Sequence, residues 1–251
     1  MKHLFDPEGR RAIEAALLAQ PLLAFDFDGT LAPIVARPDE ARVAAEVSQR
    51  LEHLARLRPV AVVTGRTVAD VAQRLGFSPQ FIVGNHGAED PGRSVGLDGS
   101  ALDGLRARLA AQASELAAAG IQVEDKQFSL ALHYRLAPEP VLAAACIEAV
   151  LDPPEPGLRT FGGKCVVNVV LADAPDKGDA VVSLVRRAGC GAAVFVGDDV
   201  NDEAVFARAQ PNWLTVRVGR GDAQSRAEFF LSGQSEVETL LDTMLGVLRA
   251  F

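Results

Sequence analysis

Short apolar runs alternate with amphipathic segments in the two end regions of the chain. The apolar runs lie at residues 22–25, 60–63, 81–83, 193–196, 214–218 and 229–231. Runs of this length suit strands that a parallel sheet buries on both faces. Apolar residues at helical spacing mark the segments around them, at residues 1–20, 38–57, 68–75, 178–188, 203–209 and 236–248. The alternation predicts an α/β fold with a doubly wound, Rossmann-like parallel sheet.

The middle of the chain has a different pattern. Its helical segments lie at residues 102–119 and 140–151, and its strand-like segments at residues 121–123, 128–135, 158–161 and 165–171. This pattern predicts an inserted α+β cap domain over residues 91–171, and a core of residues 1–90 plus 172–251. The Gly, Ser and Pro content of residues 91–100 and 172–176 marks the expected hinges. In the first helix, Ile13, Leu17 and Leu18 are expected to share the buried face.

Composition narrows the class of protein. A chain of 251 residues can hold one large domain or two modest ones. The net charge of −8 argues against a nucleic-acid-binding surface, which must be basic. Acidic and basic residues in the N-terminal segment break the apolar stretch that a signal peptide needs. No run approaches the ~18 apolar residues of a membrane span. We expect a soluble, cytoplasmic protein that does not bind membranes. We expect it to be a monomer, and an oligomer is the alternative left open.

Polar side chains follow the predicted core strands, at the edge where parallel α/β sheets bind ligands. They are Asp26, Asp28, Thr64, His86, Asp198, Asp199, Asp202 and, just before a helix, Lys177. The first two acids lie two positions apart, so on an extended segment their side chains point the same way. Alone, that pair could also be an acidic turn after a core strand.

The set of residue types indicates the chemistry of this edge. Carboxylates gathered there need a divalent cation, and an all-oxygen ligand set favours Mg²⁺ over zinc. Thr64 and Lys177 lie at expected helix starts, where backbone N–H groups favour an anion. A hard cation beside an anion site predicts phosphoryl chemistry.

At this point the sequence resembles the haloacid dehalogenase-like phosphatases. The resemblance rests on DFDGT at residues 26–30, the threonine after the second strand, the lysine before a helix, and GDDVND at residues 197–202. It implies that Asp26 is the nucleophile and that Asp28 is the general acid and base. It further implies that Thr64 and Lys177 hold the phosphoryl oxygens.

The same resemblance implies a metal site. Mg²⁺ would be held by Asp26, the backbone carbonyl of Asp28 and Asp198. Asp199 and Asp202 would support the ion through water molecules.

Further stretches resemble the trehalose-6-phosphate phosphatase family. They are DGTLAPI at residues 28–34, TGR at 64–66, GNHGAE at 84–89, KQFSLALHYR at 126–135 and GGKCVVN at 162–168. The resemblance implies a small sugar phosphate as substrate, with cap side chains pairing the sugar hydroxyls. The implied substrate-binding residues are Arg66, Asn85, His86, Gly87, Glu124, Lys126, His133, Arg135, Lys164 and Asn168. Glu124 and Lys164 could instead lie on a solvated strand edge, and His133 could make a structural hydrogen bond.

The sequence departs from the family at one position. The family usually has Glu four residues after the cap lysine, followed by a basic residue and Pro, where this chain has Asn168, Val169, Val170 and Leu171. Asn keeps an acceptor oxygen but loses the charge. The expected activity is hydrolysis of trehalose 6-phosphate. The alternatives are another glycosyl phosphate (of sucrose, glucosylglycerol or mannosylglycerate), a phosphomutase and a noncatalytic binding module.

Overall fold

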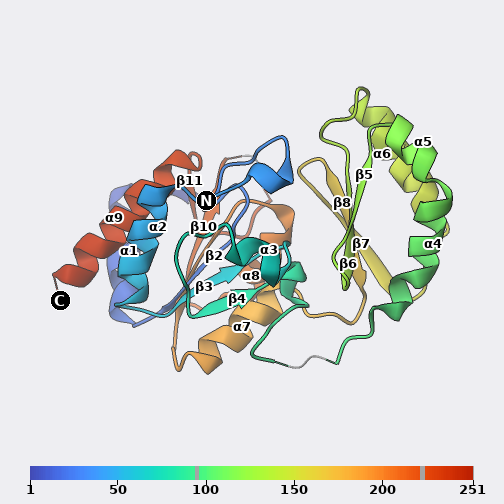
Figure 1. Ribbon diagram of the computed structural model, residues 1–251. Coiled ribbons are helices and arrows are strands. Elements are labelled where there is room, and N and C mark those ends of the chain that lie inside the picture. The colour runs from blue at the N-terminus through green and yellow to red at the C-terminus, as the bar shows by residue number, and fades with distance from the viewer. Residues whose placement is uncertain (94–95, 221–223, 251) are drawn as a thin grey trace. The chain divides into compact units, whose positions relative to one another are not determined.

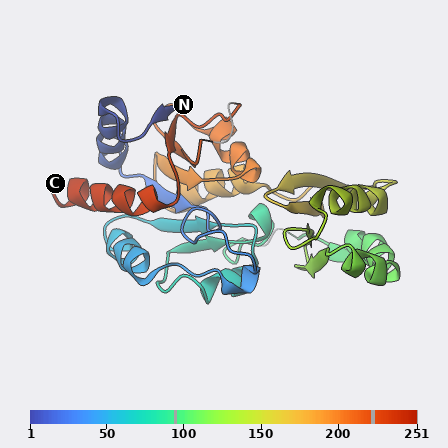
Figure 2. The same ribbon diagram turned by 90° about the horizontal axis from the view of Figure 1, so that it is seen from above.

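The computed structural model of the protein describes residues 1–93, 96–220 and 224–250. Contacts between residues divide the chain into two compact units (Figure 1). The core unit comprises Met1–Arg93 and Pro175–Phe251, and the cap unit comprises Ser94–Ala174. Both termini belong to the core unit (Figure 2). Two residues of the first expected hinge, Ser94 and Val95, lie outside the described residues.

The core unit contains a parallel sheet, as the alternation of strands and helices predicts. Over the described residues its strand order is β1-β11-β10-β9-β2-β3-β4. The strands are β1 (Lys2–His3), β2 (Leu22–Phe25), β3 (Val60–Val63), β4 (Phe81–Val83), β9 (Ala193–Gly197), β10 (Leu214–Val218) and β11 (Phe229–Leu231).

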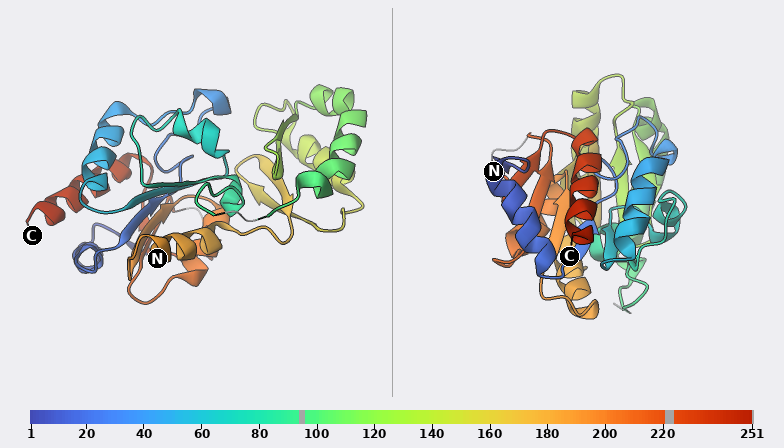
Figure 3. Two further views of the ribbon diagram at one scale, coloured as in Figure 1. Left: turned by 60° about the horizontal axis from the view of Figure 1, so that its bottom comes forward. Right: turned by 90° about the vertical axis from the view of Figure 1, so that its left-hand side faces the viewer.

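Helices cover both faces of this sheet. Clusters of buried side chains place α1 (Pro7–Leu18), α2 (Ala45–Ala55), α3 (Val68–Ala72) and α9 (Ser235–Arg249) on one face. The other face packs against α7 (Lys177–Arg187) and α8 (Glu203–Arg208). The left view of Figure 3 shows α2 and α9 above the sheet and α7 below it.

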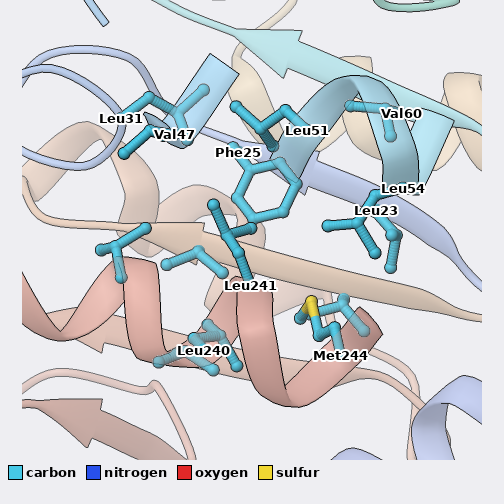
Figure 4. Packing of buried hydrophobic residues seen from close by; sticks show 14 of the residues in the cluster. Leu23, Phe25, Leu31, Val47, Leu51, Leu54, Val60, Leu240, Leu241 and Met244 are labelled. Carbon is cyan, nitrogen blue, oxygen red and sulfur yellow. The ribbon is translucent and has the colours of Figure 1, made fainter. Parts of the chain in front are cut away.

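Alternation along each strand explains how a continuous apolar run builds two cores. On β2, Leu23 and Phe25 pack with α2 and α9 (Figure 4), whereas Leu22 and Ala24 pack on the α7 face. Successive side chains of a strand point to opposite faces, so all four residues of β2 are fully buried. Packing on both faces therefore fixes the backbone of β2 up to Asp26, the residue that follows the strand.

The cap unit is an α+β unit. Its antiparallel sheet has the order β5-β6-β8-β7, and its helices lie along one side of that sheet in Figure 1. The strands are β5 (Gln122–Asp125), β6 (Ser129–His133), β7 (Leu158–Gly163) and β8 (Val166–Leu171), and the helices are α4 (Asp103–Ala111), α5 (Ala113–Ala118) and α6 (Pro140–Leu151).

The first twenty residues differ from the expected single helix. Lys2 and His3 form an edge strand parallel to β11, where the His3 ring lies 3.0 Å from a Glu236 carboxylate oxygen. Along α1, Ile13 and Leu17 are buried as predicted, but Leu18 is 57% exposed. Leu18 follows Leu17 directly, so the helical turn of about 100° per residue carries it away from the core.

Two other predicted helices are interrupted. The expected helix at residues 38–57 is a short 3₁₀ turn, Pro38–Glu40, followed by α2 only from Ala45. Between them Ala41 is extended, and the Val43 amide donates to the Arg74 carbonyl instead of to its own helix. The expected helix at residues 102–119 is α4 and α5, separated at Gln112, whose ψ is 14°.

Within the described part of the chain, no helix combines the length and the apolar character that crossing a membrane requires.

The register of α1 can be tested with two neighbouring leucines. We expect Leu17→Ala to lower the free energy of unfolding by about 2–5 kcal/mol because it leaves a cavity in the core. Leu18→Ala should cost well under half as much, since that side chain is largely in solvent. Denaturant unfolding of both variants measures the difference. Equal losses would contradict the register.

Candidate active site

The register of three central strands brings the predicted catalytic motifs to one edge. Phe25 of β2 pairs with Val196 of β9 on one side and with Val62 of β3 on the other. The residues that follow these strands therefore leave the sheet side by side. Because the strands are parallel, Asp26, Thr64 and Asp198 all lie at the carboxyl edge.

A buried lysine joins two of the acids. Lys177 is the first residue of α7 and is 1% exposed. Its ammonium nitrogen lies 2.8 Å from an oxygen of Asp26 and 2.8 Å from an oxygen of Asp202. Burying a charge is costly unless it is paired and hydrogen-bonded, so each member of this group depends on the others.

The lysine does not balance the whole acidic group. Asp26, Asp198 and Asp202 are buried, and one carboxylate oxygen from each lies within 4.8 Å of the others. Burial raises the pKa of Asp26 well above its usual range; Lys177 opposes the rise, and Asp202 and Asp198 add to it. Burial acts against the charge on Lys177, but Asp202 and Asp26 raise its pKa. Three carboxylates against one ammonium leave an excess of negative charge that fits a divalent cation.

Asp202 connects Lys177 to the backbone that follows β9. Besides pairing with the lysine, its second oxygen accepts the backbone N–H groups of Asp198 and Asp199 at 2.8 and 2.9 Å. The Asp199 side chain in turn caps the short turn Val200–Asp202. Both acids thus make direct protein contacts, which fix the direction in which Asp198 leaves β9.

The loop after β2 approaches Asp198 closely. Gly29 has φ +81°, and a Cβ there would lie 2.0 Å from Oδ2 of Asp198. Glycine is therefore required at this position for conformation and for space. The close approach forms a cradle of carboxylate oxygens, and hard cations such as Mg²⁺ prefer such oxygens. Asp26 and Asp198 both belong to the ligand set that the resemblance implies, and the loop that carries Asp28 lies beside them; that ligand set stays a prediction.

Thr64 offers a donor at the same edge. It is fully buried at the end of β3, and its hydroxyl oxygen accepts the Arg66 amide at 3.2 Å. Because that oxygen is the acceptor there, the hydroxyl hydrogen can be donated to another group.

A strained turn after β4 supports this edge. Asn85 and His86 have φ of 48° and 58°, uncommon values for residues with a side chain. The His86 ring packs directly over Gly65, where a Cβ would lie 2.3 Å from the ring, and Gly87 packs against the Asp176 carbonyl beside Lys177. This turn therefore braces two of the loops that carry catalytic candidates.

Glu89, the last residue of GNHGAE, is a member of this site that the sequence pattern did not single out. One of its carboxylate oxygens accepts the Asn85 side-chain amide at 2.8 Å and the Val68 amide at 3.0 Å. Glu89 thus ties the strained turn to the start of α3. The motif contained the signal, but only the fold shows that Asn85 and Glu89 hold each other.

The Asp28 side chain is paired with Arg66. Both of its oxygens accept hydrogen bonds from the Arg66 guanidinium, each at 2.8 Å. Asp28 is 42% exposed at its side chain, in contrast to the buried Asp26. The two acids of DFDGT therefore have different environments, as separate roles would require.

The predicted cap residues lie in the cap unit, on its sheet and the turns beside it. Register pairs Glu124 with Ala131, Ala131 with Asn168, and Asn168 with Phe161, so these side chains share one face. Glu124 lies 3.0 Å from the His133 ring and 3.3 Å from the Lys126 ammonium.

These contacts set the charge state of Glu124. Burial acts to raise the pKa of Glu124, but the His133 hydrogen bond and the Lys126 charge outweigh it and lower the pKa to about 2. Elsewhere in the unit, Arg135 donates to the Lys164 carbonyl, which connects the two basic residues through the backbone.

The fold and the site define a class of protein. The chain has the fold of the haloacid dehalogenase superfamily: it aligns with a sugar phosphatase of its subclass IIB at a TM-score of 0.61 and 13% identity, over 90% of this chain and 99% of that one. It also aligns with the C-terminal domain of C. albicans trehalose-6-phosphate phosphatase at a TM-score of 0.79 and 21% identity, over 96% of each chain.

Sequence comparison narrows the class to one family. The trehalose-phosphatase family model matches residues 24–235. A trehalose-phosphate phosphatase of Mycobacterium marinum is 33% identical over 238 residues, which cover 87% of this chain and 60% of that protein. The chain belongs to the trehalose-phosphatase family. It spans about 50–62% of the length of the curated relatives it matches.

Two glycines test the close approach to Asp198. Gly29→Ala and Gly219→Ala both place a side chain at positive φ, +81° and +94°, but a Cβ at Gly219 meets nothing within 4 Å. We expect each to lose about 1–2 kcal/mol of stability. Gly29→Ala alone should weaken binding of a divalent cation by about tenfold or more, because it displaces a ligand. Titration calorimetry with MgCl₂ measures the affinities; equal affinities would contradict the cradle.

Proposed function

We propose that the protein is a Mg²⁺-dependent phosphatase that hydrolyses trehalose 6-phosphate to trehalose and phosphate through an aspartyl-phosphate on Asp26. The observation that carries the proposal is the buried group of Asp26, Lys177, Asp198 and Asp202 at the carboxyl edge of the core sheet. Membership of the trehalose-phosphatase family supports the choice of sugar.

The first step makes the aspartyl-phosphate. An oxygen of Asp26 attacks phosphorus, and the bond between phosphorus and the sugar oxygen breaks. Asp28 gives its proton to the departing sugar oxygen. Lys177 and Thr64 lie beside Asp26 at the sheet edge, where their donors can stabilise the charge that spreads over the phosphoryl oxygens.

The second step releases phosphate. A water molecule attacks phosphorus, Asp28 takes its proton back from that water, and the bond between phosphorus and Asp26 breaks. Both carboxylates return to their starting state, so the two steps balance. Splitting the hydrolysis into two displacements lets one carboxylate serve as acid and then as base.

Bound by Asp26, Asp198 and the Asp28 carbonyl, Mg²⁺ would lower the repulsion between the nucleophile and an anionic substrate. That role follows from the unbalanced negative charge of the site. Lys177 would remain paired with Asp202, so that its ammonium stays directed at Asp26.

The sugar would be recognised by the cap unit. We propose that Glu124, Arg135, Lys164 and Asn168 pair sugar hydroxyls, because each buried hydroxyl needs a partner. The low pKa of Glu124, about 2, keeps it an acceptor at neutral pH. Asn168 is 4% exposed and provides a neutral amide where the family usually has a carboxylate. That substitution favours a second candidate, a phosphatase for another glycosyl phosphate.

A phosphate-release screen separates these candidates. We expect kcat/KM for trehalose 6-phosphate to exceed the values for sucrose, glucosylglycerol and mannosylglycerate phosphates by at least about tenfold, a difference that one or two sugar hydrogen bonds can supply. Chelation by EDTA should abolish turnover, and added MgCl₂ should restore it.

The same screen contains its control and its contradiction. Asp26→Asn removes the nucleophilic oxygen and should lower turnover of every substrate by at least about 1,000-fold. Equal or faster turnover of another sugar phosphate would replace trehalose 6-phosphate as the substrate. Full activity of Asp26→Asn would contradict the mechanism, and an isomerised sugar phosphate without phosphate release would identify a mutase.

A further inference from the structure

The Arg66 guanidinium makes a side-on contact with Asp28. Its Nε and Nη2 atoms donate to the two oxygens of that carboxylate, each at 2.8 Å. The Arg66 side chain is 11% exposed, so the contact is largely shielded on the arginine side. A bidentate arginine–carboxylate pair fixes the plane of the carboxylate as well as its position.

The remaining donors of Arg66 are directed at the protein. Nη1 donates to Asp70 at 2.8 Å, and Nη2 also donates to the Pro38 carbonyl at 2.8 Å. The guanidinium carbon lies 5.1 Å from the centre of the Phe27 ring. A guanidinium has five N–H donors, and these contacts use four of them. Arg66 therefore lacks the pair of donors that a bidentate grip on a phosphoryl group would need.

Arg66 is itself held in place. Its partner Asp70 also accepts hydrogen bonds from Arg74, one of them at 2.8 Å. Arg74 donates in addition to the Asp39 carbonyl at 2.6 Å. Asp28, Arg66, Asp70 and Arg74 thus form an unbroken chain of ion pairs that ends on the backbone of the loop before α2.

Asp28 needs such a support for the role proposed above. Its side chain is 42% exposed on a loop, and the Arg66 guanidinium holds both of its oxygens. Proton transfer in the transition state requires the carboxyl group within hydrogen-bond reach of the reacting oxygen. Each oxygen of Asp28 uses one lone pair for Arg66 and keeps another for the proton.

We propose that Arg66 is a positioning residue for Asp28 and not a substrate ligand, an inference that rests on the proposed phosphatase function. Arg66 acts through the orientation of the acid that protonates the leaving sugar oxygen. This assignment revises the interpretation of the TGR motif as a sugar-phosphate contact.

The inference is tested by comparing two leaving groups. kcat/KM reports the steps up to formation of the aspartyl-phosphate, and p-nitrophenolate leaves without the proton that a sugar alkoxide needs. We expect Arg66→Ala to lower kcat/KM for trehalose 6-phosphate by about 100-fold, the contribution of a placed general acid. For p-nitrophenyl phosphate the loss should stay below about tenfold.

Arg74→Ala is the matched control. It removes an arginine from the same chain of ion pairs, but Arg74 does not touch Asp28. Because Asp70 keeps its own contact with Arg66 in this variant, we expect Arg66 to stay in place and kcat/KM for both substrates to change by the same small factor. Arg66→Lys keeps a positive charge without the planar fork, so it should show the same substrate-dependent loss as Arg66→Ala. Thermal unfolding by circular dichroism, recorded for each variant, identifies any that fails to fold.

Chemical rescue gives a second readout. Guanidinium chloride at millimolar, non-denaturing concentration should restore trehalose 6-phosphate turnover of Arg66→Ala several-fold and leave Arg74→Ala unchanged. Equal losses on both substrates, with no rescue, would overturn the positioning role while leaving the phosphatase intact. A wild-type protein that releases no phosphate from any sugar phosphate would instead overturn the proposed function, and this inference with it.

Discussion

The ammonium of Lys177 between Asp26 and Asp202 is the interaction on which the rest of the core unit depends. All three side chains are buried. Removing one partner of a buried ion pair leaves an uncompensated charge and typically costs about 3–5 kcal/mol. Stability alone does not explain this group, because well-packed apolar side chains of similar volume would often stabilise the fold as well or better. The electrostatic potential that this group provides for a reaction explains its place at the sheet edge better than stability does.

The fold supplies what that group requires. Strand β2 lies between β9 and β3 and is buried along its whole length, so the position of Asp26 is set by two strand neighbours. Lys177 begins α7, and a capping box formed by Asp176 and Asp179 fixes that helix start. The tight packing of Gly178 against the Ala204 carbonyl then joins α7 to α8. The end of β2 and the starts of α7 and α8, which are distant in sequence, thus lie close together at the Asp26 carboxylate.

The core architecture and its catalytic candidates could be predicted because strand ends are marked by local sequence. Acids at or just after the ends of apolar runs located Asp26 and Asp198, and parallel pairing then required them to be neighbours. The local sequence pattern was less informative for segments whose backbone conformation depends on tertiary contacts. Val43 lies within the expected helix at residues 38–57, yet its amide donates to the Arg74 carbonyl, outside that segment. Nothing near Arg66 in sequence shows that Asp28 is its partner.

The environments of the two acids in DFDGT were also beyond sequence reasoning. A strand pattern places both side chains on the same side, but burial and partners come from the whole core unit. Asp26 faces a lysine and two carboxylates, whereas Asp28 faces an arginine. These environments suit the proposed roles, in which Asp26 would attack phosphorus and Asp28 would move the proton in a two-step hydrolysis.

The most direct test of this account is to find where phosphate is attached during turnover. The protein, with Mg²⁺, would be mixed with trehalose 6-phosphate, quenched in acid over a single-turnover time course, digested and analysed by mass spectrometry. We predict a transient acid-stable, hydroxylamine-sensitive phosphate on the peptide that contains Asp26. Phosphate on any other residue, or complete turnover with that peptide unmodified at every time point, would contradict it.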